Sequence, residues 1–292
     1  MIMERWFVLA VVAILLWGFA QIFAKLSTSK VGVARVAVLV AVVNGALYFL
    51  GFYYWHENVP ISLVEGALAL ASCIAGITAY LCYFESILDG QIAIAGTIPA
   101  AYPALTVIGA LVVLSESLTA SQGIGVAATI CGVVALSYEP NPRSEHAMPR
   151  RSVFFVLLAL ALWGFWGLTS KMAIARIGPG NILGFYVVSS LTVPLVYAFF
   201  RKVRPARLEN RVPSWTSWIF AAMGLAANVL GTFAFLFALD TGSASFVVPI
   251  SGAYPLVTVI LAVALLHEKL SRLQIVAVVF VVIGLMMIGA SG

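Results

Sequence analysis

The segment Leu16-Trp17-Gly18-Phe19 recurs 146 positions later as Leu162-Trp163-Gly164-Phe165. A second segment, Ala101-Tyr102-Pro103-x-x-Thr106, recurs 152 positions later as Ala253-Tyr254-Pro255-x-x-Thr258. Chance does not keep such identities in order at fixed offsets, so the sequence indicates an internal duplication. The second offset also aligns Glu116 with Glu268, Leu118 with Leu270, Gln122 with Gln274 and Gly132 with Gly284.

The composition excludes a water-soluble protein. Of the 292 residues, 63% are hydrophobic and only 9% are charged, and the mean hydropathy is +1.08. A soluble domain carries about 25% charged residues, so these few charges cannot cover a water-exposed surface. The net charge of +5 would suggest nucleic acid as a partner of a soluble protein. In so apolar a chain it indicates basic loops arranged by membrane topology, and we expect no nucleic-acid partner.

Hydrophobic runs long enough to cross a bilayer follow one another along the whole chain. A bilayer core of about 30 Å needs roughly 20 apolar residues per helix, and polar or Gly/Pro-containing breaks separate these runs. The runs are too long for barrel strands, so we expect an all-α integral membrane protein. The ten expected transmembrane helices cover residues 6–25, 33–54, 62–88, 91–115, 119–138, 152–172, 181–200, 214–239, 243–266 and 271–290.

Each copy of the duplicated unit holds five of these spans. Because five is odd, the second copy enters the membrane from the opposite side, which makes two inverted five-helix repeats. We expect the first repeat over residues 1–138, a polar linker over 139–151 and the second repeat over 152–292. The six-residue difference between the two offsets fits a longer basic loop in the second repeat, Arg201 to Pro213. Inverted repeats are typical of secondary transporters, whose substrate binds between the halves; a receptor or assembly scaffold grown by duplication is the alternative.

The repeated motifs resemble the drug/metabolite transporter superfamily, of the EamA type. The resemblance lies in Trp17-Gly18 and Trp163-Gly164, in the two Ala-Tyr-Pro segments, and in the helix-end sequences Glu116-Ser117-Leu118 and Glu268-Lys269-Leu270. It covers nearly the whole chain, and the chain is similar to exporters of aromatic amino acids and other metabolites. The resemblance implies a basket of ten helices around a central cavity, lined by the first, third and fourth spans of each half. Members carry amino acids, drugs, sugar phosphates and other metabolites, so the resemblance does not define the substrate.

Tryptophans at mid-depth are the first candidates for the substrate site. Trp17 and Trp163 lie about 12 residues into their spans, although Trp normally prefers the membrane interface, where its N–H stays hydrated. A midplane Trp repeated in both halves favours a cavity, and Trp166 would extend the same surface by one helical turn. Packing against lipid or other helices is the alternative.

Four tyrosines extend this set. On the third span, Tyr80 and Tyr83 share a helical face with Gly76. Together with Tyr102 and its repeat equivalent Tyr254, they predict an aromatic cage that suits a flat or cationic organic molecule. Plain packing of the rings is again the alternative.

Prolines and amides within apolar helix supply the remaining candidates. Pro103 and Pro255 each remove a helical hydrogen bond; for Pro103, the freed carbonyl belongs to Pro99. We expect such a carbonyl to face a wet cavity or a neighbouring donor, where it could accept a hydrogen bond from substrate. Asn44 and Asn228 either join helices or contact substrate. We place Pro99 and Asn228 in the substrate site and expect Asn44 to join helices.

The sequence offers no catalytic set. The three histidines fall at loops or helix ends, the three cysteines form no CxxC, and no phosphate loop or nucleophile elbow is present. We therefore expect no enzyme, no metal and no cofactor. Glu85 is the acid nearest to mid-depth, yet it lies close to the turn at Asp89, so the sequence provides no clear ion-coupling site.

These observations favour a secondary active transporter that exports small organic metabolites, such as amino acids, by alternating access. The alternatives are efflux of cationic aromatic drugs and passive facilitation. We expect a monomer in the inner (plasma) membrane, crossing it many times, with the small-molecule substrate and lipid as its partners.

The basic residues predict that both termini lie outside the cytoplasm. With ten spans, the loops on the terminal side carry three basic residues and the opposite loops carry 13, together all 16 in the chain. The positive-inside rule places the 13-charge side in the cytoplasm, whereas members of the resembled superfamily are commonly drawn with cytoplasmic termini. A C-terminal reporter that fluoresces only in the cytoplasm should stay dark, and one active only in the periplasm should be active. Bright cytoplasmic fluorescence would contradict this orientation.

Overall fold

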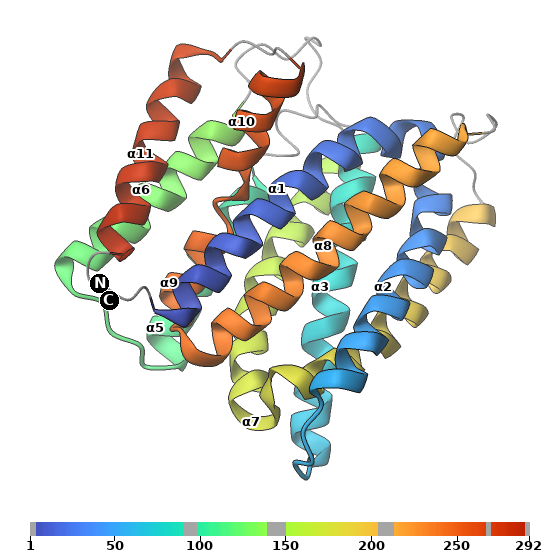
Figure 1. Ribbon diagram of the computed structural model, residues 1–292, viewed down its shortest axis with the longest axis horizontal. Helices are drawn as coiled ribbons and strands as arrows, with labels where there is room; N and C mark the ends of the chain where they lie inside the picture. The colour runs from blue at the N-terminus through green and yellow to red at the C-terminus, as the bar shows by residue number, and fades with distance from the viewer. Residues whose placement is uncertain (1–3, 90–97, 139–149, 204–212, 267–269, 290–292) are drawn as a thin grey trace.

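The chain folds into a bundle of helices (Figure 1). The computed structural model describes residues 4–89, 98–138, 150–203, 213–266 and 270–289, and every regular element in these ranges is helical. The elements are α1 (Arg5–Val31), α2 (Val33–Trp55), α3 (Leu63–Asp89), the 3-10 helix η1 (Pro99–Ala101), α5 (Tyr102–Val113), α6 (Ala120–Ser137), α7 (Arg150–Val203), α8 (Trp215–Thr241), α9 (Ala244–Ser251), α10 (Tyr254–Leu266) and α11 (Arg272–Gly289).

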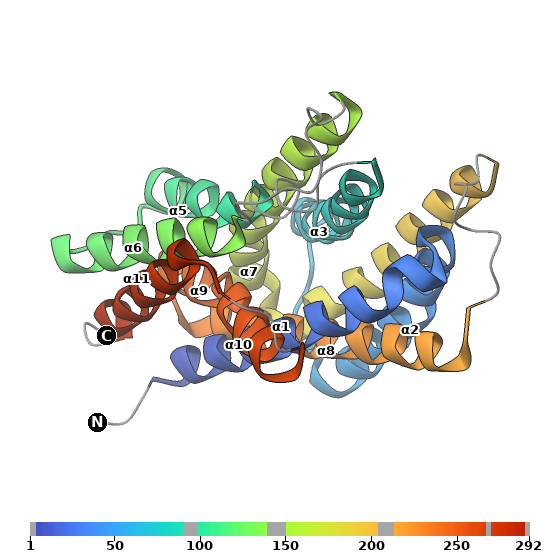
Figure 2. The same cartoon turned by 90° about the horizontal axis from the view of Figure 1, so that it is seen from above.

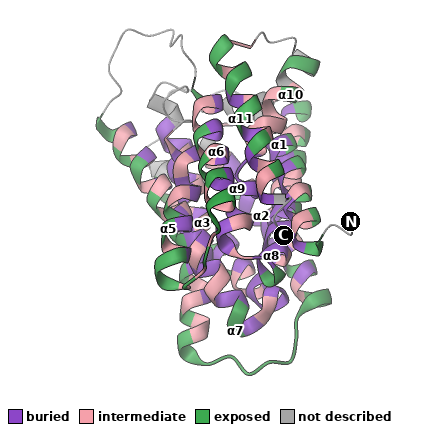
Figure 3. Cartoon of the chain, turned by 90° about the vertical axis from the view of Figure 1, so that its left-hand side faces the viewer, coloured by how far each residue is buried: buried purple, intermediate pink, exposed green. Residues whose placement is uncertain are grey.

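The described helices suit a membrane in length and in surface. Seven helical segments among the described residues are long and apolar enough to cross a bilayer, and two shorter apolar helices accompany them. Buried residues gather where helices meet, whereas exposed residues cover the outward faces (Figure 3). Those faces expose large apolar side chains such as Leu63 (90%), Val112 (76%) and Phe199 (68%). So much exposed apolar surface is expected of a protein solvated by lipid.

Two glycines set the boundary between the first and second helix of each copy. Gly32 and Gly178 lie 146 positions apart, the offset of the first repeated segment, and both adopt a positive φ, 87° and 80°. Gly178 divides α7 into two segments, as the sequence predicts. The first span was expected to end near residue 25, but α1 continues to Val31. Polar residues alone do not stop a helix, whereas a glycine at positive φ does.

The first helices of the two copies run in opposite directions. α1 begins beside the end of α8, where a Cβ at Gly242 would lie 2.9 Å from Trp6. The first segment of α7 ends at the same place, because the Lys171 ammonium donates hydrogen bonds to the carbonyls of Leu239 (2.6 Å) and Gly242 (2.9 Å). The positive charge of Lys171 therefore lies at the C-terminal end of α8, where a helix favours a cation.

The two copies interleave. The most extensive contacts join α1 to α8 and α3 to α7, so the first helix of each copy packs on the third helix of the other. α6 and α11, the fifth helices, pair at one side of the bundle, while α2 and the second segment of α7 pair at the other (Figure 2). Capping hydrogen bonds open both α6 and α11: Thr119 pairs with Gln122, and Ser271 pairs with Gln274.

The contact between α6 and α11 explains why the duplicated unit keeps a glycine in its fifth helix. A Cβ at Gly132 would lie 2.9 Å from the Val281 nitrogen, and a Cβ at Gly284 would lie 2.7 Å from the Gly125 oxygen. These atoms belong to the backbone of the facing helix, which cannot move aside as a side chain can. The repeated glycines therefore allow the two helices to touch.

Gly284→Ala should destabilise the protein by about 1–3 kcal/mol through overpacking. Gly123→Ala is the matched control on α6, because a Cβ there would meet nothing within 4 Å. Thermal unfolding of the purified variants in detergent measures both effects. An unchanged Tm for Gly284→Ala would mean that the close contact between α6 and α11 is wrong.

Candidate functional site

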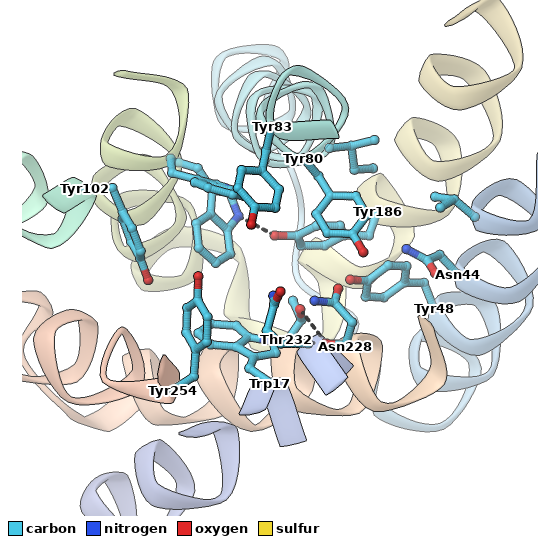
Figure 4. A pocket seen from close by; sticks show the side chains of 16 residues that line it. Trp17, Asn44, Tyr48, Tyr80, Tyr83, Tyr102, Tyr186, Asn228, Thr232 and Tyr254 are labelled. Carbon is cyan, nitrogen blue, oxygen red and sulfur yellow. Dashed lines mark hydrogen bonds between the residues drawn. The ribbon is translucent and has the colours of Figure 1, made fainter. Parts of the chain in front are cut away.

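A cavity of about 90 Å³ lies between the two copies (Figure 4). All of the first four helices of each copy contribute to it, whereas the resemblance implied only the first, third and fourth. The second helices contribute through α2 and the second segment of α7. Its lining comprises Trp17, Gln21, Val40, Asn44, Tyr48, Gly76, Ile77, Tyr80, Tyr83, Tyr102, Trp163, Trp166, Tyr186, Asn228, Thr232 and Tyr254.

Most of the residues predicted for the substrate site line this cavity. They are the three tryptophans, the four tyrosines and Asn228. Pro99 is the exception: it is buried in η1 and is absent from the lining. Its carbonyl accepts the N–H of Tyr102, so the bond removed by Pro103 is replaced within the 3-10 turn. The break is thus closed locally.

Broken helices hold the two Ala-Tyr-Pro segments in place. The 3-10 turn precedes Tyr102 in the first copy, and the backbone leaves the helix at Gly252 and Ala253 before Tyr254 in the second. The two breaks pack together, because a Cβ at Gly252 would lie 2.9 Å from Pro103. Both breaks are buried in protein, the condition under which irregular backbone is tolerated inside a membrane.

The Trp-Gly and Tyr-Pro-x-x-Thr motifs contact each other across the copies. Thr106 donates a hydrogen bond to the Gly164 carbonyl (3.1 Å), and Thr258 donates to the Gly18 carbonyl (3.5 Å). The neighbouring rings are arranged in the same way: Trp163 lies 6.0 Å from Tyr102, and Trp17 lies 6.1 Å from Tyr254 between centroids. The repeated motifs therefore form two equivalent joints between the copies.

Trp17, Trp166 and Phe235 form an aromatic cluster, called here the aromatic floor; the two tryptophans line the cavity, and Phe235 follows the lining residue Thr232 toward the end of α8. Phe235 is fully buried and stacks on Trp166 at 4.8 Å and lies 5.4 Å from Trp17. The indole N–H of Trp17 donates to the Asn228 carbonyl (3.1 Å), and that of Trp166 donates to the Tyr186 hydroxyl. Gly76 allows Trp166 to approach α3, since a Cβ there would lie 2.8 Å from the indole.

Aromatic rings occur along the whole cavity, and amides mark its polar end. Figure 4 shows Tyr102 and Tyr254 at one end and Asn44 with Tyr48 at the other. Trp17 lies between the ends, since its indole N–H donates to the Asn228 carbonyl. None of the described lining residues carries a charge. The cavity can therefore accommodate a small molecule with a flat apolar part and an uncharged or cationic polar part.

Sequence reasoning missed part of the polar end. Asn44 and Tyr48 lie four residues apart on one face of α2, and Asn228 and Thr232 lie four apart on α8. Polar residues spaced four apart within an apolar helix share one face, and this pattern in the sequence could have indicated the polar end of the cavity. Asn44 was expected to join helices, and the structure places it in the lining of the cavity.

Two carboxylates near helix ends, those of Glu85 and Glu116, bind other groups of the protein. Glu85, 5% exposed, binds the Arg151 guanidinium at 2.7 Å and accepts a hydrogen bond from Tyr197. It does not belong to the lining of the cavity. The carboxylate of Glu116 accepts the N–H groups of Ala244 (2.8 Å) and Ser245 (2.9 Å) at the start of α9. This contact caps α9.

Comparisons with known proteins agree with this architecture. An uncharacterized protein of Methanocaldococcus jannaschii is 33% identical over 72 residues, which are 25% of this chain and 53% of that protein; the match thus spans about half of its length. A solved crystal structure is similar with a TM-score of 0.75 over 97% of this chain and 95% of its own, at 18% identity. The model of the EamA-like transporter family matches twice, over residues 4–138 and 150–290. These two matches cover nearly the whole chain, which therefore belongs to the EamA-like transporter family of multi-pass membrane proteins.

Proposed function

We propose that the chain is a secondary active transporter of ten spans that exports small organic metabolites, such as amino acids, by alternating access. The cavity between two oppositely directed copies is the observation that carries the proposal. Inverted-repeat transporters bind substrate at such an interface. The division into repeats over residues 1–138 and 152–292, the inner membrane and a monomeric state belong to the same proposal.

The aromatic floor supports alternating access. At the offset of 152, Tyr83 is the equivalent of Phe235, and Tyr83 lies 5.7 Å from Trp163 as Phe235 lies 5.4 Å from Trp17. Phe235 also stacks on Trp166, with ring centroids 4.8 Å apart, so we take the side of Phe235 as the sealed side of the cavity. The residue equivalent to Trp166 is Ala20, which offers no ring. Exchange of the sealed side between these equivalent contacts would carry a substrate across.

The direction of export follows from the same floor combined with the charge distribution. We take the floor as the closed side of the cavity; it lies toward the end of α8 and the termini, which the positive-inside rule assigns to the exterior. A substrate would then enter from the cytoplasmic side and leave past Phe235.

Efflux of cationic aromatic compounds is the second candidate. It is favoured by the absence of charged side chains from the described lining and by the tyrosine and tryptophan faces there, which attract cations.

Counterflow between loaded vesicles tests the proposal. Reconstituted protein should accelerate the exchange of at least one amino acid or aromatic amine, and the rate should saturate. A passive pore would give neither saturation nor counterflow. Cells that express the chain should also survive toxic amino acid analogues better than cells with empty vector. No difference for any compound in either assay would contradict the proposed function.

Substitutions in the lining should reduce transport without loss of folded protein. Trp163→Ala and Tyr80→Ala should each lower the rate of counterflow several-fold, because they remove ring surface from the cavity. Trp17→Ala should do the same, and Trp17→Phe keeps an aromatic ring at this more tightly packed position and should lower the rate less. Transport per folded molecule, measured after size-exclusion chromatography, separates the two effects. If activity falls only in proportion to the folded protein, these rings serve packing alone.

A further inference from the structure

We infer that Asn44 recognises an amine on the transported molecule. This inference rests on the proposed function and names the polar group that its substrates share. Asn44 lines the cavity from α2 and is only 6% exposed. Its side-chain oxygen Oδ1 is buried and has no hydrogen-bond partner among the described residues. A buried acceptor without a partner is unfavourable, so a donor is expected to meet it during the working cycle.

The position of Asn44 distinguishes it from other buried oxygens without partners. Three serine hydroxyls in the described part of the chain share this property, on Ser152, Ser190 and Ser251, and none of them lines the cavity. Ser190 is the equivalent of Asn44 at the offset of 146. The two copies thus place an unpartnered polar side chain at the same position, but only the first copy brings it to the cavity.

The surroundings of Asn44 favour a donor that carries positive charge. Figure 4 shows Asn44 beside Tyr48, whose ring stacks on Tyr186 with centroids 4.6 Å apart. Aromatic faces and phenol oxygens attract an ammonium group.

The same surroundings disfavour an anion. No described lining residue is cationic. The indole N–H groups of Trp17 and Trp166 already donate to Asn228 and Tyr186, so they are not free to bind a carboxylate or phosphate. A buried charge of either sign without a counter-charge is strongly unfavourable, and aromatic faces compensate a cation but not an anion. An amine is also the polar group common to amino acids and cationic aromatic compounds, the two proposed substrate classes.

Three compounds with the same ring test this inference: 2-phenylethylamine carries only the amine, phenylalanine carries amine and carboxylate, and 3-phenylpropionate carries only the carboxylate. The purified full chain is titrated with each while its intrinsic fluorescence is followed, because three tryptophans line the cavity. We expect the amine to bind most tightly, phenylalanine more weakly and the acid weakest.

Asn44→Leu removes the acceptor at similar volume and should weaken binding of the two amines roughly 10-fold or more, the range for a hydrogen bond to a charged group. Asn44→Asp adds a negative charge and should strengthen binding of 2-phenylethylamine. Ser190→Ala is the matched control, since it removes the equivalent unpartnered oxygen outside the cavity, and should leave all three affinities unchanged.

Equal binding of acid and amine would overturn the inference. So would an unchanged amine affinity in Asn44→Leu, or, if that variant does not fold, in Asn44→Asp. Absence of binding by all three compounds would overturn it as well. The proposed function would then still stand if counterflow of another metabolite saturates, so the two failures are distinguishable.

Discussion

Inside a bilayer, each backbone N–H and C=O must find its partner within the protein, and the fold follows from this constraint. Where the chain leaves the helix, at η1 and at Gly252, the irregular backbone is buried and closes its own hydrogen bonds, as from Tyr102 to Pro99. At the helix ends beside the termini, Lys171 binds the last carbonyls of α8 and Glu116 binds the first N–H groups of α9. These two charges thus complete helix ends, and no charged residue belongs to the described lining of the cavity.

The same constraint explains how far the sequence predicts the fold. Helices, their approximate spans and the duplication follow from hydropathy and from Trp-Gly and Tyr-Pro-x-x-Thr, because those motifs are contacts between the copies. The end of α1 was misplaced, since Gly32 and not the polar stretch before it stops the helix. The family match confirms two copies. The sequence predicts ten spans, whereas the described residues contain seven helical segments long and apolar enough to cross a membrane.

The cavity was harder to predict, because the copies keep positions but not side chains. Val40 and Tyr186 are equivalent at the offset of 146, and Tyr80 and Thr232 at the offset of 152, and all four line the cavity. A search for identical residues finds Trp17 with Trp163 and Tyr102 with Tyr254, but it cannot find pairs that have diverged. Tyr48 and Tyr186 were missed for this reason, as neither has an aromatic equivalent.

That divergence has a physical consequence. Two identical inverted copies would present the same cavity to both sides of the membrane, so neither side would be preferred. Here the joints at Gly18 and Gly164 stay equivalent, with ring distances of 6.1 and 6.0 Å, whereas Trp166 adds a stacked ring on one side and Ala20 adds none on the other. Stacking of aromatic rings contributes about 0.5–1.5 kcal/mol beyond burial. A difference of this size biases an equilibrium between two conformations about 2- to 12-fold without locking either, because each 1.4 kcal/mol is a factor of ten. A duplicated fold can thus keep equivalent joints between its copies, while a few substitutions at equivalent positions make its two sides different.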